Sequence, residues 1–518
     1  MKCGIDGCDN QTFKGLNKCA LHCEKERIHE DSRSTVLSEF NRLLNLYILD
    51  DVLLRYIPDS EDERYINEIE KYRKNNKCLY DSMIFKEKFC EYKIGFHGIL
   101  FPSTSLIDYT ETLMIFENIW FNKCVFYVKF FNLKSTGVFF EECVFKYDIY
   151  IKPATLFLLK ENYIFYQCVF EDKVYIGREG RYKYIFGESL FSGCVFENSI
   201  KFRNAILKKE PFLGIDEREL KLSTLEIYDC NFDGGFKLNS THISYLWIEN
   251  TNFLIGFWML KANITTLNCI NAVIDGLFDA SNSSFVRAKF NRTKFLDVAD
   301  FEEVKFGKTN AEFLNSGEDT TQFKYVTFMN AANFKNTSFS YGLDFENVDL
   351  REQPNFLKSN INPHDTNRET FRIIKYSFDS RGNKIEAGKY HAYEMNAYIN
   401  ELSFSKNFWQ LVILHANNLI SRFGQSYIIP FALLVGSVSL YSYLLNSYKK
   451  SLQFRTYELS YGVECITEWL NTIARNFLPF ARFISDKRGF EFVSLFFYII
   501  FAILIWQIIV AVKKQTQH

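Results

Sequence analysis

The residues at the start of the chain whose types and spacing could do chemistry are thiols and an imidazole. They form a Cys/His set with two short loops between its members: Cys3, Cys8, Cys19 and either His22 or Cys23. Tetrahedral zinc prefers such ligands, and four protein ligands leave no open position for a substrate. The spacing therefore predicts a structural zinc site within residues 1–24. A disordered tail that carries free cysteines is the alternative.

Signatures of catalysis are missing from the sequence. It contains no G-x-S-x-G nucleophile turn, no phosphate-binding loop and no H-E-x-x-H metal pair. The eight histidines lie far apart, with no acid or nucleophile at an informative distance. We therefore expect a protein that is not an enzyme.

A short motif, F-x-x-C-V-F, recurs in the sequence. It indicates the scaffold that must position any functional site. Its copies occupy Phe121–Phe126, Phe140–Phe145, Phe165–Phe170 and Phe191–Phe196. In each copy two large aromatics stand five residues apart, and a small residue precedes the second by two. A period of five fits neither a helix nor a strand, so each unit should form one side of a coil.

In such a coil the aromatic fills the axis, and the small residue packs beside it. Four sides would close a square turn, and neighbouring turns would pair their backbones roughly 4.8 Å apart. The repeat cysteines should form an inward ladder of reduced thiols that only pack: Cys124, Cys143, Cys168 and Cys194. Ten phenylalanines represent the expected core: Phe126, Phe145, Phe170, Phe196, Phe232, Phe253, Phe290, Phe301, Phe328 and Phe339.

These frames resemble the pentapeptide-repeat family, whose members form a right-handed quadrilateral β-helix. The resemblance implies such a solenoid over residues 96–352. Steps of six residues, and a lost frame at 175–184, at 210–220 and around Gly317, interrupt the fives. We interpret these interruptions as bulges or corner loops.

A helical region is expected over residues 25–95, before the solenoid. From Ser32 to Ile57 apolar residues follow one helical face. An open coil end presents unpaired strands, so this helix should dock there as a cap. A free membrane-binding helix is the alternative.

Two uncharged segments, 427–445 and 492–512, lie within a C-terminal region that we assign to a membrane domain over 406–518. Their lengths suit a hydrocarbon core of roughly 30 Å, which predicts two transmembrane helices. Buried helices of a soluble protein are the alternative. The pattern of 408–420 is typical of an interfacial helix, with Trp409 at headgroup depth.

Between these spans the apolar residues recur at helical spacing up to Pro479. This pattern predicts a helix that either dips into the membrane as a pore helix or lies flat upon it. Glu464 and Glu468, one turn apart, would ring a cation mouth if several copies assembled around an axis. The alternative is the solvated face of a surface helix.

The segment Phe371–Met395 and the F-G-Q-S at Phe423–Ser426 resemble the linker of bacterial pentapeptide-repeat proteins that end in a two-helix, potassium-channel-like module. The resemblance implies a helical hairpin over residues 362–405 that couples the solenoid to the membrane. No T-V-G-Y-G-like filter lies between the spans, so these residues do not themselves indicate potassium selectivity. The N-terminal Cys/His set resembles the short zinc-binding knuckles found at the ends of many proteins.

The net charge and the cysteine content indicate which partners and which cellular compartment to expect. The 61 basic and 62 acidic residues leave a formal net charge of −1, so no nucleic-acid partner is expected. Unpaired cysteines and the lack of a signal peptide favour a reducing compartment. A count of basic residues would place the loop between the spans in the cytoplasm. We nevertheless expect the thiol-rich solenoid to lie in the cytoplasm, attached to the bacterial inner (cytoplasmic) membrane.

The resulting hypothesis is a membrane-anchored solenoid that binds an unknown protein partner or a signal. It would couple this event to an oligomeric two-span module that is channel-like or perturbs the membrane. The alternative is a membrane-tethered interaction scaffold without conduction. A soluble DNA-mimicking inhibitor, as known for some pentapeptide-repeat proteins, is disfavoured because acidic and basic residues nearly balance over 285–350.

Overall fold

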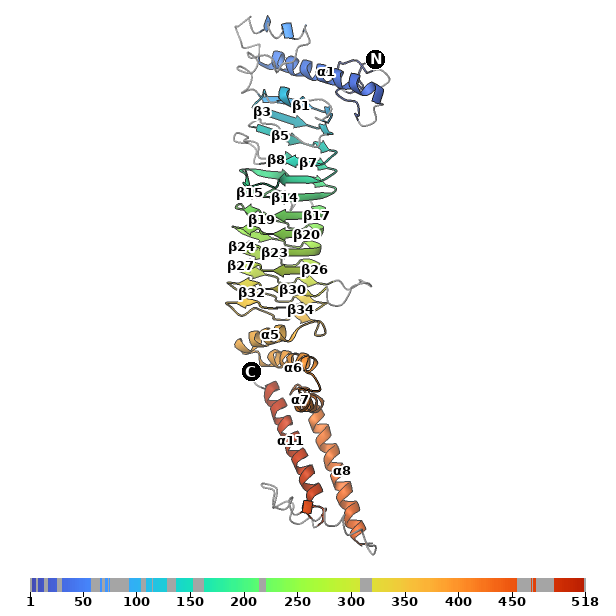
Figure 1. Cartoon of the computed structure of the whole chain (residues 1–518), viewed down its shortest axis with the longest axis vertical. Helices are drawn as coiled ribbons and strands as arrows, with labels where there is room; N and C mark the ends of the chain where they lie inside the picture. Colours follow the sequence, from blue (N-terminus) through green and yellow to red (C-terminus); the bar gives the residue numbers. More distant parts are fainter. Residues whose placement is uncertain are drawn as a thin grey trace. The chain divides into compact units, whose positions relative to one another are not determined.

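The computed structural model describes residues 2–5, 8–13, 17–25, 30–56, 66–67, 70–72, 74, 93–103, 109–113, 115–127, 137–151, 163–213, 220–307, 319–453, 467, 469–471 and 489–516 (Figure 1). The chain divides into two compact units, Met1–Asp365 and Thr366–His518.

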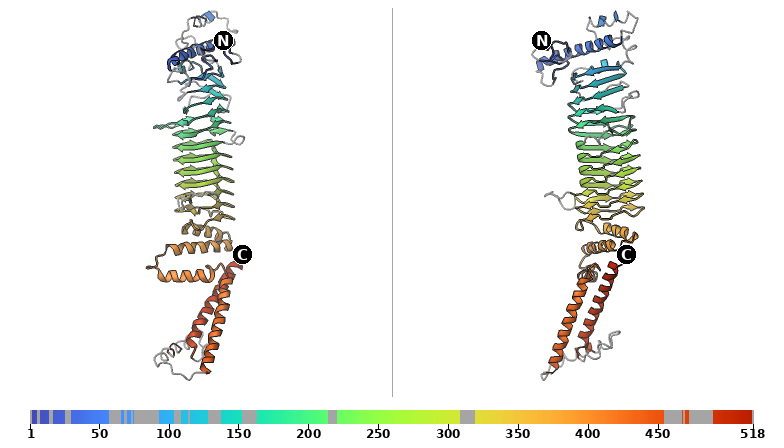
Figure 2. Two further views of the ribbon diagram at one scale, coloured as in Figure 1. Left: turned by 90° about the vertical axis from the view of Figure 1, so that its right-hand side faces the viewer. Right: turned by 180° about the vertical axis from the view of Figure 1, so that it is seen from behind.

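The first unit is a β-solenoid of about 11 turns, and the strand pairs of its ladders are parallel. Figure 2 shows these turns stacked along the coil axis. The predicted β-solenoid fold is thereby confirmed.

Five sheets run along the coil, and we name each by its first strand. The β1 sheet contains β1 (Lys93–His97), β3 (Asn118–Asn122), β5 (Gly137–Glu141), β8 (Tyr163–Tyr166), β12 (Ser189–Ser192) and β16 (Phe212–Leu213). The β2 sheet contains β2 (Leu100–Phe101), β4 (Val125–Phe126), β6 (Val144–Phe145), β9 (Val169–Phe170) and β13 (Val195–Phe196).

The other three sheets carry the later turns. The β7 sheet contains β7 (Ile149–Ile151), β10 (Val174–Gly177), β14 (Ser199–Arg203), β17 (Lys221–Tyr228), β20 (His242–Glu249), β23 (Asn263–Ile270), β26 (Ser284–Asn291), β29 (Lys305–Phe306), β30 (Thr321–Lys324), β33 (Ser338–Phe339), β34 (Leu343–Asp344) and β36 (Asn360–Ile361). The β11 sheet contains β11 (Tyr184–Phe186), β15 (Ala205–Leu207), β18 (Asn231–Phe232), β21 (Asn252–Phe253), β24 (Val273–Ile274), β27 (Lys294–Phe295), β31 (Thr327–Phe328) and β35 (Asp349–Leu350). The β19 sheet contains β19 (Phe236–Lys237), β22 (Gly256–Trp258), β25 (Leu277–Asp279), β28 (Ala299–Asp300) and β32 (Ala332–Asn333).

The turns have four sides. The long strand β26 serves two of them, because its first residues pair with β29 and its last residues pair with β30. The β11 and β19 sheets supply the other two sides. Left-handed residues mark corners: Asn250 has a φ of 51° and Lys261 a φ of 55°.

The regular turn is longer than four equal sides of five residues. His242, Asn263 and Ser284 occupy equivalent positions of successive turns, at a spacing of 21 residues. The extra residue lies at the corner between the β11 and β19 sheets, where buried Phe253 is followed by buried Met259, six residues on. Steps of six are therefore a regular feature of these turns rather than interruptions.

The expected core phenylalanines are all buried. Phe126, Phe145, Phe170 and Phe196 form one stack, with ring centroids 4.9 to 5.0 Å apart and nearly parallel planes. The repeat cysteines are free thiols that each lie within hydrogen-bonding distance of a backbone carbonyl of the preceding turn, as Cys124 Sγ does with Phe96 O at 3.4 Å. Thr293 Oγ1 donates in the same way to Cys269 O at 3.1 Å. The small position of the repeat therefore carries a hydrogen-bond donor in several turns.

Helix α1 (Glu30–Tyr56) covers the first turn, and a short helix, α4 (Thr110–Leu113), follows that turn. Phe40 of α1 is buried edge-on against Phe101, with ring centroids 6.0 Å apart. Tyr47 stacks on Phe96 at 5.6 Å and donates its hydroxyl hydrogen to the carbonyl oxygen of Gly95. The helix thus occupies the end of the coil.

Of the expected loops, the segment after β10 runs without a strand to β11. The loop at 214–219 and the one around Gly317 lie outside the described residues. So does most of the segment between the predicted spans.

The second unit is helical, with α5 (Arg368–Ser380), α6 (Lys384–Glu401), α7 (Phe408–Ser421), α8 (Ile428–Gln453) and α11 (Glu491–Thr516). Helices α5 and α6 pack as a hairpin in which Phe378 stacks on Tyr390 at 5.6 Å. Lys375 and the buried Glu394 form an ion pair of 2.6 Å between the two helices. Each helix begins at an asparagine whose side chain accepts a hydrogen bond from the first turn.

Two helices of this unit are long and apolar enough to cross a membrane: α8 over Ile428–Tyr448 and α11 over Glu491–Lys514. They pack against each other, and Tyr441 Oη donates a buried hydrogen bond of 3.0 Å to Ser494 Oγ. Figure 2 shows α7 lying crosswise at the start of α8. The predicted helices at 427–445 and 492–512 are therefore present, which suggests membrane association.

The six-residue corner generates a stability prediction at Gly276. A Cβ atom at Gly276 would overlap the carbonyl oxygen of Ile255, whereas a Cβ at Gly187 would meet no atom within 4 Å. Gly276→Ala should lower the free energy of unfolding by about 1–3 kcal/mol, because the backbone of neighbouring turns must move apart. Urea unfolding of both variants measures the effect, and equal midpoints for Gly276→Ala and Gly187→Ala would contradict this reading of the corner.

Candidate functional site

The structure brings four of the five N-terminal candidates together. The ligand atoms of Cys3, Cys8, Cys19 and His22 all lie within 4.8 Å of one another. Individual separations are 3.2 Å from Cys19 Sγ to His22 Nδ1, 3.6 Å from Cys3 Sγ to His22 Nδ1, and 3.7 Å from Cys8 Sγ to Cys19 Sγ. Sulfur ligands 2.3 Å from a tetrahedral ion stand about 3.8 Å apart. The cluster could therefore bind a metal ion.

Local backbone bonds explain how distant positions converge. Cys3 N donates to Asn10 O at 2.9 Å, and an isolated antiparallel bridge joins Lys2 to Gln11. The amide of Cys19 donates to Cys3 Sγ at 3.4 Å, which draws the second chain segment toward the first. A donor of this kind also stabilises a metal-bound thiolate.

A tight turn of the backbone determines which of His22 and Cys23 enters the cluster. The amides of both residues bond to the carbonyl oxygen of Cys19. This turn directs Nδ1 of His22 into the cluster, while Sγ of Cys23 donates to Ala20 O at 3.8 Å. His22 is therefore the fourth member of the cluster, and Cys23 is a neighbour outside it.

Burial shifts the pKa values of both the histidine and the cysteine ligands. Burial, together with the positive charge of nearby Lys25, lowers the pKa of His22 to about 4. The imidazole is therefore neutral at pH 7 and can donate a lone pair to a metal ion. Burial also raises the pKa of Cys19 to about 12. The thiol is then protonated in the absence of a cation, so binding of a metal ion must release its proton.

The proposed pore residues are not placed by the structure. Glu464, Glu468 and Pro479 lie outside the described residues. Near them, Asn471 is described, and its Oδ1 accepts a hydrogen bond of 2.9 Å from the amide of Phe492 at the start of α11.

A turn between α7 and α8, which we call the joint (residues 421–425), brings four helices together. Ser421 Oγ donates to Gln507 Oε1 of α11 at 2.9 Å, and Lys514 Nζ of α11 donates to Phe423 O at 3.0 Å. On the other side, a Cβ at Gly388 of α6 would lie 2.9 Å from Gln425 Nε2. Sequence reasoning identified the F-G-Q-S only as part of a linker and missed these contacts.

The joint also has an unusual backbone. Arg422, Phe423 and Gly424 follow one another at φ values of 48°, 57° and 78°. Left-handed conformations of non-glycine residues are costly and persist only where the surroundings hold them. The hydrogen bonds from α11 supply such support.

Helices α7, α8 and α11 expose large apolar side chains. Trp409 and Leu419 of α7 are 74% and 76% exposed, and Trp506 of α11 is 64% exposed. Contiguous exposed apolar surface of this kind is typical of contact with a membrane or another protein. Trp409 thus has the exposure that its expected place at headgroup depth requires.

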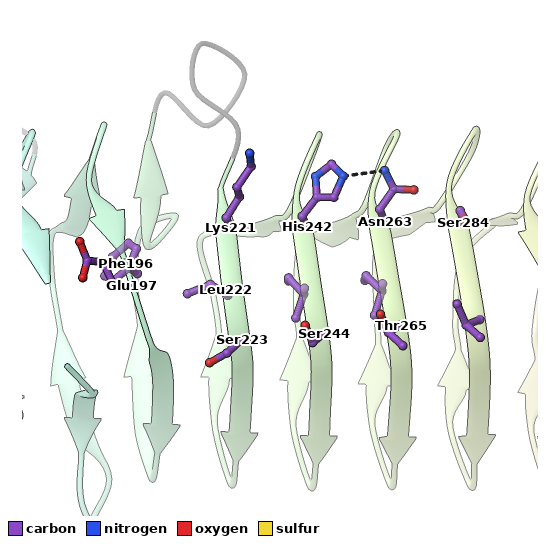
Figure 3. A pocket seen from close by; sticks show the side chains of 13 residues that line it. Phe196, Glu197, Lys221, Leu222, Ser223, His242, Ser244, Asn263, Thr265 and Ser284 are labelled. Atoms are coloured by element: carbon purple, nitrogen blue, oxygen red, sulfur yellow. Dashed lines mark hydrogen bonds between the residues drawn. The ribbon is translucent and has the colours of Figure 1, made fainter. Parts of the chain in front are cut away.

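A groove of about 820 Å³ runs along the solenoid beside β17, β20, β23 and β26. Lys221, His242, Asn263 and Ser284 extend along it at equivalent positions of successive turns (Figure 3). The His242 ring nitrogen and Asn263 Nδ2 are hydrogen-bonded at 3.1 Å. Hydroxyl, amide and imidazole groups thus share this surface with apolar side chains such as Leu222 and Ile264, an arrangement that the repeat pattern did not predict.

Comparison of the chain with protein-family models, curated proteins and solved structures gives no match.

The cluster geometry generates a metal-binding prediction. The purified protein should hold one metal ion per chain, and Cys8→Ser should lose most of it because a closed tetrahedral site needs all four ligands. Cys23→Ser is the matched control, since that thiol lies outside the cluster, and it should keep the ion. Elemental analysis of the purified variants measures the metal content, and equal loss in both variants would contradict the assignment of His22.

Proposed function

We propose that this protein is a membrane-anchored pentapeptide-repeat protein of the bacterial inner membrane, with its solenoid in the cytoplasm. The solenoid binds a protein partner or a signal and couples this event to an oligomeric two-span module that is channel-like or perturbs the membrane. Coupling rather than catalysis is its role. The observation that supports this proposal best is the joint, where helices of the linker hairpin and of both spans contact one another.

A membrane explains the surface of the second unit. Apolar side chains of α8 and α11 face outward along both helices, which is costly in water and favourable in hydrocarbon. Between the helices, the polar groups of Tyr441 and Ser494 satisfy each other, as groups inside a bilayer must.

The joint supports coupling because it ties both spans to the linker hairpin. A displacement of α6 would act through Gln425 on the start of α8. The same turn is bonded to α11 through Gln507 and Lys514, so the second span would respond together with the first. A backbone held in a costly conformation by a few bonds can act as a two-state element.

An oligomer follows from the small number of spans. Two packed helices enclose no pore, so a channel-like module needs several copies around an axis. The outer face of α8 carries Ala432, Gly436 and Ser439, all exposed. Small residues at such positions allow another helix to approach closely in a membrane.

The metal ion that we propose for the N-terminal cluster is zinc. Three thiolates and one imidazole form one of the common structural zinc sets. With four protein ligands the site has no open position, so its role is structural.

The alternative function is a membrane-tethered scaffold in which the spans are only an anchor. The groove along β17 to β26 favours this candidate, because it is an extended surface on which hydrogen-bonding groups recur in successive turns beside apolar side chains. Conduction distinguishes the two functions.

Ion flux through proteoliposomes that contain the full-length protein tests the coupled module. We expect measurable flux, and we expect Lys514→Met to change it several-fold because Phe423 O then loses the bond that ties the joint to α11. Lys513→Met is the matched control, since Lys513 is exposed and should leave the flux unchanged. Inserted protein that conducts under no condition would favour the scaffold.

Oligomer formation tests the outer face of α8. Gly436→Leu should weaken self-association in detergent by about 1 kcal/mol or more, because the larger side chain prevents close helix approach. Val435→Leu changes a neighbouring exposed position and should have little effect. Chemical cross-linking of both variants measures the oligomeric fraction, and equal cross-linking would place the interface elsewhere.

A further inference from the structure

The first turn of the solenoid contains the strand β2. Among the described residues it is the terminal strand of its sheet, where it pairs with β4. Such a strand presents backbone donors and acceptors that pair readily with another chain. The end of the coil therefore needs a cover over β2.

The cover comes from the loop that carries two of the metal ligands, which we call the metal loop (residues 19–23). Leu100 N of β2 donates to the carbonyl oxygen of Leu21 at 2.9 Å. Leu21 lies between Cys19 and His22 and is itself buried, as is Ala20. One short segment thus binds the strand with its backbone and the metal ion with its side chains.

The metal loop continues the ladder of the sheet. In the next rung, Val125 N donates to Ile99 O at 3.0 Å, and Val144 N then donates to Cys124 O at 2.9 Å. Leu21 O accepts from Leu100 as Ile99 O accepts from Val125, so the loop takes the place of one more turn. A side-chain bond from Lys25 Nζ to the same carbonyl oxygen, at 3.1 Å, holds the loop from behind.

Metal–ligand bonds would strengthen the attachment of this loop. The described contacts among the cluster residues are sulfur contacts and one short turn, which are weak compared with metal–ligand bonds. An ion joins Cys3 and Cys8 to the loop and so fixes three chain segments at once. By contrast, α1 holds the neighbouring strand β1 through Tyr47 without any metal ligand.

We infer that the metal site is a lock on the end of the solenoid. With the ion bound, the metal loop covers β2, and without it the loop leaves the backbone of β2 open to solvent. Depletion of the metal would thereby switch the N-terminal end from a closed cap to an open strand edge. This inference rests on the proposed metal site.

Hydrogen exchange of the full-length protein in detergent micelles tests the lock, with zinc as the probe metal. Chelation should speed exchange of the Leu100 amide about tenfold or more, and added zinc should restore its protection. The Val125 amide, one rung inside, should not change. Cys8→Ser should behave as the chelated protein, and Cys23→Ser as the loaded one.

The outcomes separate this inference from the metal site itself. If zinc is bound and removed while exchange at Leu100 stays the same, the lock is wrong and the metal site stands. If the wild-type protein binds no zinc, both fail.

Discussion

The structure of the solenoid depends on the pairing of each turn's backbone with the turns next to it. A parallel ladder keeps equivalent residues of successive turns in register. Their spacing is 21 from β17 to β26 and differs between other turns, where Phe126 pairs with Phe145 and Phe295 with Phe328. Side chains then fall into columns. Phenylalanines stack in the interior, and small residues beside them donate hydrogen bonds to carbonyl oxygens of the turn before.

The same pairing creates a problem at the end of the coil, where the next turn is missing. The N-terminal region supplies partners for the unpaired backbone groups at two places, in two different ways. Tyr47 of α1 satisfies the carbonyl oxygen of Gly95 with a side-chain hydroxyl, whereas Leu21 satisfies the amide of Leu100 with its own backbone. A helix can cover an edge by packing alone. An irregular loop has little core of its own, so a metal site is an effective way to hold it.

The core and coil could be predicted from the sequence because each side needs one large apolar residue, which leaves a visible period. The six-residue steps were expected as bulges or corner loops, and the extra residue does lie at a corner. Its recurrence in successive turns could not be predicted, since Leu254, Asp275 and Leu296 do not share one side-chain type and only the backbone requires the extra residue. His22 and Cys23 could not be separated either, because a turn of the backbone decides which side chain enters the cluster. The joint was missed because its bonds connect residues 86 and 91 positions apart.

Polar contacts carry more weight at the joint than comparable contacts on the solenoid surface. An ion pair such as that of Lys201 and Glu226 competes with water and contributes little. At the end of apolar helices, a carbonyl oxygen without a partner costs much more, because hydrocarbon offers no hydrogen bond in exchange. Lys514 satisfies Phe423 O, and Gln507 accepts from Ser421, at a turn that contains three successive residues with left-handed φ values. In the coupling that we propose, these are the bonds that a movement of the linker hairpin would have to break.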